Sequence, residues 1–312
     1  PFFQWTLAGT LDFTEGGILR NKASAATVGV LLALYVFGIG KAAVMPLHRW
    51  LPAAMVAPTP VSALLHAVAI VKAGVFTVMK VVVYVFGIDF LSESGASIWL
   101  MYVASFTLLA SSIVALSKDN LKARLAYSTI SQLGYMMLGL GVGGFVAGLF
   151  HLITHAFFKA CLFLGSGSVI HAVHTQDIRE MGGLRRKMPT TYWTFLISTL
   201  ALAGVPMFAG YYSKDQIIAT AMAWGMEHGA AAWMPFLFGA VGAFMTTFYM
   251  FRVIFLTFHG EPQVAEKYQH AHESPLVMTL PLVVLATFAG AANPAVRLLA
   301  AADWQLHYQV AA

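Results

Sequence analysis

The sequence has 312 residues, of which 59% are hydrophobic and only 10% are charged, and its mean hydropathy is +0.75. Soluble domains carry about 25% charged residues, so this composition excludes a soluble globular protein and indicates one embedded in lipid. The formal net charge of +5 does not indicate nucleic-acid binding, because the basic residues are spread over separate loops. The single cysteine, Cys161, lies in an apolar run, which excludes a disulfide framework and a cysteine metal cluster.

The predicted elements, in chain order, are apolar stretches long enough to cross a bilayer, which takes about 20 mostly apolar residues. Eight such stretches occupy residues 25–46, 59–86, 98–117, 124–141, 145–173, 190–224, 232–258 and 275–300. We therefore predict an all-helical, polytopic membrane bundle with little chain left for a soluble domain. Because the sequence starts at Pro1 and lacks the features of a signal peptide, we expect a fragment of a longer protein.

The loops between these stretches alternate in charge. The loops at 87–97, 141–145 and 225–231 contain no lysine or arginine. The other loops hold Arg49; Lys118, Lys122 and Arg124; Arg179, Arg185, Arg186 and Lys187; and Lys267. This asymmetry predicts that the basic loops face the cytoplasm, with Arg20 and Lys22, before the first stretch, as the exception. Binding of an anionic partner by these loops is the alternative.

Two stretches contain a proline beside a lysine. In the run GIGKAAVMPLHRWLP, Lys41 lies five residues before Pro46, and in AGVPMFAGYYSKDQ, Lys214 lies eight residues after Pro206. Proline breaks or kinks a helix, and broken helices within a membrane occur where they are buried in protein or line a wet cavity. Paired breaks of this kind are typical of transporters built from repeats. We expect both lysines to be buried at such breaks, with an ordinary proline kink as the alternative.

The stretch LFHLITHAFFKACLF carries the clearest polar pattern. His151, His155 and Lys159 are spaced by four residues, so they share one face of the helix. Histidine titrates near neutral pH, and charged side chains in mid-span usually mark ion or proton pathways. We therefore predict a proton relay on this face. Structural hydrogen bonding is the alternative, and a zinc-protease motif is disfavoured because Leu152 follows the first histidine where that motif needs glutamate.

Other ionisable residues lie in or at the ends of spans. His66 and Lys72 are six residues apart and so lie on different helix faces, where each is expected to connect with other helices unless Lys72 snorkels to the interface. Lys214 and Asp215 are adjacent and point about 100° apart. One is therefore expected to face a conduction path, while the other meets a neighbouring helix or subunit or offsets the lysine's charge.

Other catalytic signatures are absent from the sequence, which has no phosphate-binding P-loop, no dinucleotide fingerprint after a strand and no nucleophile elbow. The glycines of FLGSGSV lie in an apolar stretch and are expected to allow close helix packing. No cofactor is implied for this chain.

Several long motifs resemble the antiporter-like membrane subunits of respiratory complex I, and most closely those of the subunit L or chain 5 type. These motifs occupy residues 45–67, 122–141, 151–172, 177–189 and 208–217, so the resemblance covers nearly the whole chain. It implies a partial proton-conducting membrane domain over 1–312, taken from a fourteen-helix core of two inverted repeats. Residues 24–86 would end the first repeat, 98–258 would form the second and 275–300 the final core helix.

The resemblance also implies roles for particular residues. Lys41 and Lys214 would be the broken-helix lysines of the two repeats, and Asp215 would adjoin the second. The remaining groups of the conducting path would be His66, Lys72, Lys122, His151, His155 and Lys159. The family's glutamate partner of the first broken-helix lysine has no counterpart here, because Glu15 lies outside the spans, and it is expected in a preceding part of the chain.

The implied function is proton translocation by a non-redox subunit of an NADH:quinone oxidoreductase, driven by electron transfer elsewhere in the complex. Its partners would be protons, the lipid bilayer and other membrane subunits, in a bacterial inner membrane or an equivalent energy-transducing membrane. The alternative is a subunit of a multisubunit Na⁺/H⁺ antiporter or of a membrane-bound hydrogenase. Lys72 in the run VKAG favours this alternative, whereas the motifs at 177–189 and 272–282 favour subunit L. A passive scaffold with buried polar groups is a third class.

Overall fold

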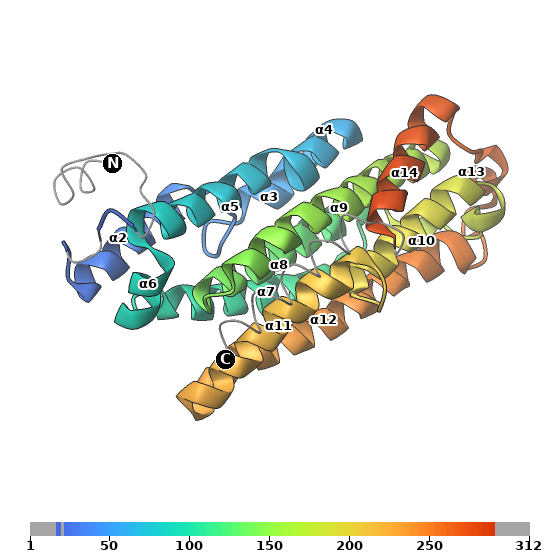
Figure 1. Cartoon of the computed structure of the whole chain (residues 1–312). Coiled ribbons are helices and arrows are strands. Elements are labelled where there is room, and N and C mark those ends of the chain that lie inside the picture. Colours follow the sequence, from blue (N-terminus) through green and yellow to red (C-terminus); the bar gives the residue numbers. More distant parts are fainter. Residues whose placement is uncertain (1–16, 20–21, 291–312) are drawn as a thin grey trace.

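The computed structural model describes residues 17–19 and 22–290, and every regular element within these residues is a helix. The helices form an elongated bundle with most of their axes along its length (Figure 1). The expected all-helical membrane fold is confirmed. By length and composition, four of the described helical stretches suffice to cross a membrane: 59–86, 98–117, 145–173 and 230–259.

The first part of the bundle is built from interrupted helices. Helix α2 (Ala25–Gly38) ends well before α3 (Trp50–Ala53), so the predicted stretch 25–46 is not one helix. The next span, 59–86, is continuous but changes its winding along its length. It comprises α4 (Thr59–Ala63), a π-helical turn (Leu64–Val68), α5 (Ile70–Lys80) and a second π-helical turn (Val81–Phe86), and α6 (Ile88–Ser94) follows.

Three long helices form the centre of the bundle: α7 (Ile98–Ser117), α8 (Leu121–Gly141) and α9 (Phe145–Val173). Nearly every residue of α8 is buried, although it carries several polar side chains. Glycines allow α8 to approach α7 closely: a Cβ added at Gly134 would lie 2.9 Å from the Leu108 side chain, and one added at Gly141 would lie 2.8 Å from Met101. This packing places the polar groups of α8 inside the protein rather than against lipid.

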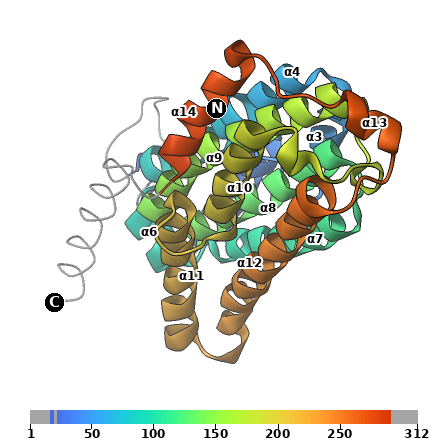
Figure 2. The ribbon, with the colours of Figure 1, turned by 90° about the vertical axis from the view of Figure 1, so that its right-hand side faces the viewer.

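The last part contains the second break. The predicted stretch 190–224 consists of α10 (Pro189–Ala203) and α11 (Ala209–His228). The five residues between them include Pro206 and also Gly204, whose backbone is left-handed. Helices α11 and α12 extend side by side beyond the others (Figures 1 and 2). The remaining elements are α12 (Trp233–Ile254), a π-helical turn (Phe255–His259), α13 (Ala265–His270) and α14 (Leu276–Ala289). The predicted final span continues to residue 300, and its part beyond 290 lies outside the described residues.

Most of the basic loops meet at one end of the bundle. The Leu121 amide donates to the Gln176 carbonyl at 2.8 Å, and the Ile178 amide donates to that of Asp119 at 3.0 Å. The Arg179 guanidinium lowers the pKa of the Asp177 carboxyl to about 2, so this loop pair is ionised at neutral pH. Turns without lysine or arginine gather elsewhere, around a hollow of about 210 Å³ lined by residues from 82–98, 140–143 and 224–228.

Arg49 does not belong to that basic end. The Met45 amide, four residues before it, donates to the Thr107 hydroxyl halfway along α7, at 3.2 Å. The segment around Arg49 is therefore part of the first helix break rather than a loop between two spans. The loop expected after residue 46 is instead the end of the break followed by helical turns over 50–56, and the membrane side of Arg49 stays a prediction.

The second break depends on a close approach of two half-helices at Gly210. A Cβ at this position would lie 1.8 Å from the Ala201 carbonyl oxygen, which belongs to the backbone and cannot move aside. We expect Gly210→Ala to destabilise the protein by about 1–3 kcal/mol, as overpacking of a tight contact does. Thermal unfolding of the purified protein in detergent measures this effect. The matched control is Gly38→Ala, where no atom lies within 4 Å, and equal midpoints for the two variants would contradict the prediction.

Candidate functional site

The polar face predicted on α9 lies inside the bundle. His151, His155 and Lys159 are each 0% exposed, and the rings of the two histidines lie 5.9 Å apart between centroids. The four-residue spacing therefore produces one polar face, as expected, and neighbouring helices cover it. Because α9 lies at the centre of the bundle (Figure 1), these side chains meet groups from several other helices.

Lys72 joins this face from α5. Its Nζ lies 2.5 Å from His155 Nδ1, although the two residues are 83 positions apart in the sequence. Lys72 is 5% exposed, which excludes a snorkelling lysine within the described bundle. The contact places an amine and an imidazole within direct proton-transfer distance.

His151 continues the contacts toward α11. Its Nδ1 lies 2.9 Å from the Ser213 hydroxyl, and its Nε2 lies 3.1 Å from Gln132 Oε1 on α8. The Thr154 hydroxyl lies 3.0 Å from that of Ser213. Imidazole and hydroxyl groups both donate and accept hydrogen bonds, so this segment of the site can pass a proton in either direction.

Lys214 follows Ser213 and is held by the second helix break. Its Nζ donates to the Leu202 carbonyl at 2.7 Å and lies 5.2 Å from the centre of the Tyr135 ring. In an unbroken helix that carbonyl would accept the amide hydrogen of residue 206, which is a proline and has none. The break therefore supplies the acceptor that a buried lysine needs. We call Lys72, His155, His151, Ser213 and Lys214 the buried row.

Lys159 leads from the same α9 face toward α12. Its Nζ donates to the Ser128 hydroxyl at 2.8 Å and to the Leu125 carbonyl at 3.2 Å. Ser128 also accepts the Tyr249 hydroxyl at 2.9 Å. This group forms a side branch near the basic end, since Arg124 donates to the Tyr249 carbonyl at 3.1 Å and contacts the loop residue Lys118.

His66 and Lys122 lie apart from the buried row. The His66 ring is fully buried 5.0 Å from that of Phe163, and neither of its nitrogens has a hydrogen-bond partner among the described residues. Lys122 donates to the Ala57 carbonyl at 2.6 Å, which ties the start of α8 to the segment before α4. Both predicted site residues are buried, but the structure does not bring them into contact with the histidines of α9.

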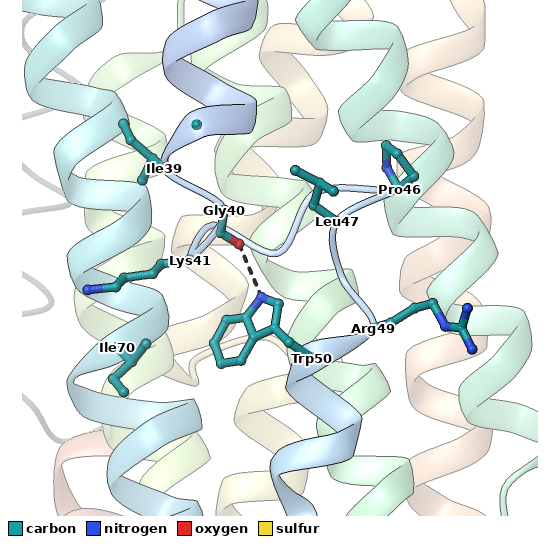
Figure 3. A pocket seen from close by; sticks show the side chains of 9 residues that line it. Ile39, Gly40, Lys41, Pro46, Leu47, Arg49, Trp50 and Ile70 are labelled. Atoms are coloured by element: carbon teal, nitrogen blue, oxygen red, sulfur yellow. Dashed lines mark hydrogen bonds between the residues drawn. The ribbon is translucent and has the colours of Figure 1, made fainter. Parts of the chain in front are cut away.

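Lys41 lies at the first helix break, on the outside of the described bundle. The chain is not helical from 39 to 49, which confirms the break expected beside Pro46, but the Lys41 side chain is exposed rather than buried. It borders an open hollow of about 680 Å³ with Arg49 and Trp50, whose indole donates to the Gly40 carbonyl at 3.1 Å (Figure 3). The expected burial was wrong for the described residues, because no other described segment closes this face.

Asp215 and Lys214 point to different environments, as their adjacency predicted. Lys214 is 3% exposed in the interior, whereas Asp215 is exposed on the outer side of α11. The described residues form no ion pair with Asp215. The lysine alone belongs to the buried row.

Sequence reasoning missed Gln132, Ser213, Ser128 and Tyr249. All four are 0% exposed. Gln132 and Ser213 contact His151, Ser128 contacts Lys159, and Tyr249 reaches the site through Ser128. A weak signal was present, since Gln132 and Ser128 belong to a cluster of polar residues within a predicted span and Ser213 directly precedes Lys214. Neutral polar residues are common in membrane helices, however, so their type alone did not single them out.

The fold and site define a polytopic helical membrane protein whose bundle encloses a row of basic and hydroxyl groups. The family described as "NADH:quinone oxidoreductase/Mrp antiporter, TM" matches residues 2–246. The chain belongs to this family.

Similar proteins include chain 5 of the NAD(P)H-quinone oxidoreductase of a Picosynechococcus species, with 44% identity over 89% of this chain and 45% of the relative. Subunit L of the NADH-quinone oxidoreductase of Rickettsia bellii is 45% identical over 81% of this chain and 38% of the relative. Subunit L of the F(420)H(2) dehydrogenase of Methanosarcina mazei is 46% identical over 83% and 39%. This chain therefore spans less than half the length of these relatives.

A solved structure, that of the Mrp complex from Dietzia sp., shares the fold. One of its chains superposes with a TM-score of 0.77 at 24% identity, covering 95% of this chain and 62% of the other. This likeness shows a shared fold over nearly all of this chain.

Proposed function

We propose that the chain is part of a proton-translocating membrane subunit of an NADH:quinone oxidoreductase, of the subunit L kind. It moves protons through buried lysines and histidines and performs no redox chemistry, while electron transfer elsewhere in the complex drives the movement. The observation that carries this proposal is the 2.5 Å contact between Lys72 and His155 on two different helices. It extends the polar face of α9 into a row that crosses the bundle.

The proposed path runs along the buried row. A proton passes from Lys72 Nζ to His155 Nδ1, across the gap between the two histidines, and from His151 through the Ser213 hydroxyl to the vicinity of Lys214. The two histidines make no direct hydrogen bond: their ring centroids lie 5.9 Å apart, and His155 Nε2 has no hydrogen-bond partner among the described residues. Because Ser213 occupies His151 Nδ1, the proton must arrive at His151 Nε2, where one bridging water from His155 Nε2 would replace the 3.1 Å contact with Gln132 Oε1.

Electrostatic repulsion supplies the coupling between sites. The buried side chains in the described part of the bundle include four lysines, Lys72, Lys122, Lys159 and Lys214, and no aspartate or glutamate. Like charges interact far more strongly in a low-dielectric interior than in water, so an ammonium at one position opposes protonation of the next. We propose that a proton arriving at one end thereby expels a proton from the other.

We also propose that Lys41 acts as the broken-helix lysine of the first repeat. The described backbone places it next to the row: a Cβ at Gly74 would lie 2.6 Å from the Lys41 carbonyl carbon, two residues from Lys72. A glutamate from a preceding part of the chain would face its side chain in the open hollow. On this proposal 24–86 ends the first inverted repeat, 98–258 forms the second and 275–300 is the final core helix.

The proposed setting is the bacterial inner membrane or an equivalent energy-transducing membrane. The basic loops would face the cytoplasm, in keeping with the positive-inside pattern. Other membrane subunits of a respiratory complex would be the partners of this chain.

A Na⁺/H⁺ antiporter subunit is the second candidate. The run VKAG resembles subunits of that class, and its lysine, Lys72, makes the first contact of the row.

The test is proton uptake by proteoliposomes that contain the assembled complex in nominally Na⁺-free buffer, followed with a pH-sensitive dye while the redox substrates are supplied. We expect pumping at a rate independent of added Na⁺, because the two lysines and two histidines of the row bind protons and no described buried carboxylate offers a cation ligand. Pumping that requires Na⁺ would favour the antiporter reading.

A further inference from the structure

An apolar groove on the outer surface of α12 has no role in the buried row. It has a volume of about 480 Å³ and follows one face of the helix and the π-helical turn after it. Phenylalanines form most of its wall, and Phe244, Phe248 and Phe255 are 73%, 61% and 58% exposed. The residues that line it are Phe244, Thr247, Phe248, Phe251, Arg252, Phe255 and Leu256.

Arg252 is the one charged residue among those that line the groove. Its guanidinium donates to the Leu116 carbonyl at 3.1 Å and to Asp119 at 2.9 Å, and the side chain is 35% exposed. Leu116 lies one residue before the end of α7, so this guanidinium sits at the depth where the bundle meets the basic loops. A guanidinium has five N–H donors, so Arg252 retains three for another acceptor.

The charges around Arg252 do not balance. Asp119 lies 3.6, 3.5 and 2.9 Å from the guanidiniums of Arg124, Arg179 and Arg252, and Asp177 pairs with Arg179 at 2.6 Å. Three cations thus share two carboxylates, so this cluster as a whole carries one excess positive charge. Arg252 is the member of the cluster that borders the groove, and an anion placed beside it would offset that excess.

We propose that this groove binds one anionic phospholipid of the leaflet at the basic end. The phosphate accepts hydrogen bonds from Arg252, and an acyl chain lies along the phenylalanines of α12. Charge-assisted hydrogen bonds to phosphate favour arginine, and basic positions between helices on the cytoplasmic side suit anionic headgroups. The lipid would link the loop after α7 to α12.

The experiment uses the full-length protein, delipidated in mild detergent and titrated with phosphatidylglycerol or phosphatidylcholine, with bound lipid counted by native mass spectrometry. We expect the wild type to bind one phosphatidylglycerol about fivefold more tightly than phosphatidylcholine, the effect of one basic contact at a membrane surface. Arg252→Gln should abolish this preference, whereas Arg252→Lys should keep most of it.

A second variant tests the groove without disturbing Arg252. Thr247 makes its hydrogen bond within its own helix, to the Ala243 carbonyl, so Thr247→Trp fills the groove and leaves the contacts between helices intact. We expect it to release one bound lipid of either headgroup. Equal wild-type affinities for the two lipids, or an undiminished lipid count in Thr247→Trp, would overturn the proposal. A peptide adduct in place of lipid would show that another helix occupies the groove and would overturn it as well.

Discussion

Replacing Lys214 with alanine is expected to reduce proton pumping by the assembled complex by on the order of 100-fold, the contribution of a positioned proton-transfer group. Lys214 is the ionisable residue at the α11 end of the buried row, and its Nζ is held by the Leu202 carbonyl that the helix break leaves without an amide donor. The protein should still insert and assemble, because the break itself depends on Gly204, Pro206 and Gly210 rather than on the lysine. Proton uptake by proteoliposomes, measured alongside the redox rate, reports the effect.

Two further variants separate proton transfer from charge alone. Lys214→Arg keeps the positive charge but should not restore pumping, since arginine does not release its proton at accessible pH. Lys267→Ala, which removes an exposed loop ion pair with Glu180, should pump normally. Wild-type pumping in both Lys214→Ala and Lys41→Ala would reject the mechanism and leave the passive scaffold as the explanation of the buried lysines.

Lys72→Met is expected to interrupt the row at its other end, with a loss of pumping of similar size. Methionine has a similar length and fills the space beside His155 but cannot carry a proton. The double variant Lys72→Met with His155→Leu should pump no worse than either single variant, because residues that act through one contact are not additive. Proteoliposome proton uptake for the three variants gives this comparison.

The matched control for Lys72 is Lys118→Met at the basic end. The Lys118 ammonium lies over the Tyr127 ring at 5.8 Å and contacts no member of the buried row, so its removal should leave pumping unchanged. Additive losses from Lys72→Met and His155→Leu would mean that the two residues serve separate paths. The 2.5 Å contact would then be structural.

Sequence patterns identified the features that depend on local chemistry. Hydropathy indicates membrane helices because a backbone in lipid must satisfy its hydrogen bonds within each helix. The four-residue spacing of His151, His155 and Lys159 predicted a shared face because the helix has 3.6 residues per turn. Proline and glycine marked both breaks for an equally local reason, since they alter the backbone at their own positions.

The predicted stretches followed the helices closely, except where a break was hidden by apolar neighbours. The stretch 190–224 is two helices, and 25–46 ends its helix at Gly38. A window of hydropathy averages over about 20 residues, so an apolar interruption such as 39–49 or 204–208 does not lower the average enough to be seen. Composition therefore predicted where the spans begin and end, but it did not predict whether the helix inside a span is continuous.

By itself, the sequence determined the membrane class, the helical faces and the positions of the two breaks. Only the tertiary structure decided that Lys72 meets His155, that Ser213 and Gln132 hold His151, and that Lys214 is buried while Lys41 is exposed. Periodicity places a residue on a face of its own helix, but the neighbour of that face depends on how the helices pack. Close glycine contacts and the spaces between side chains set that packing, and they act between residues that are tens of positions apart in the chain.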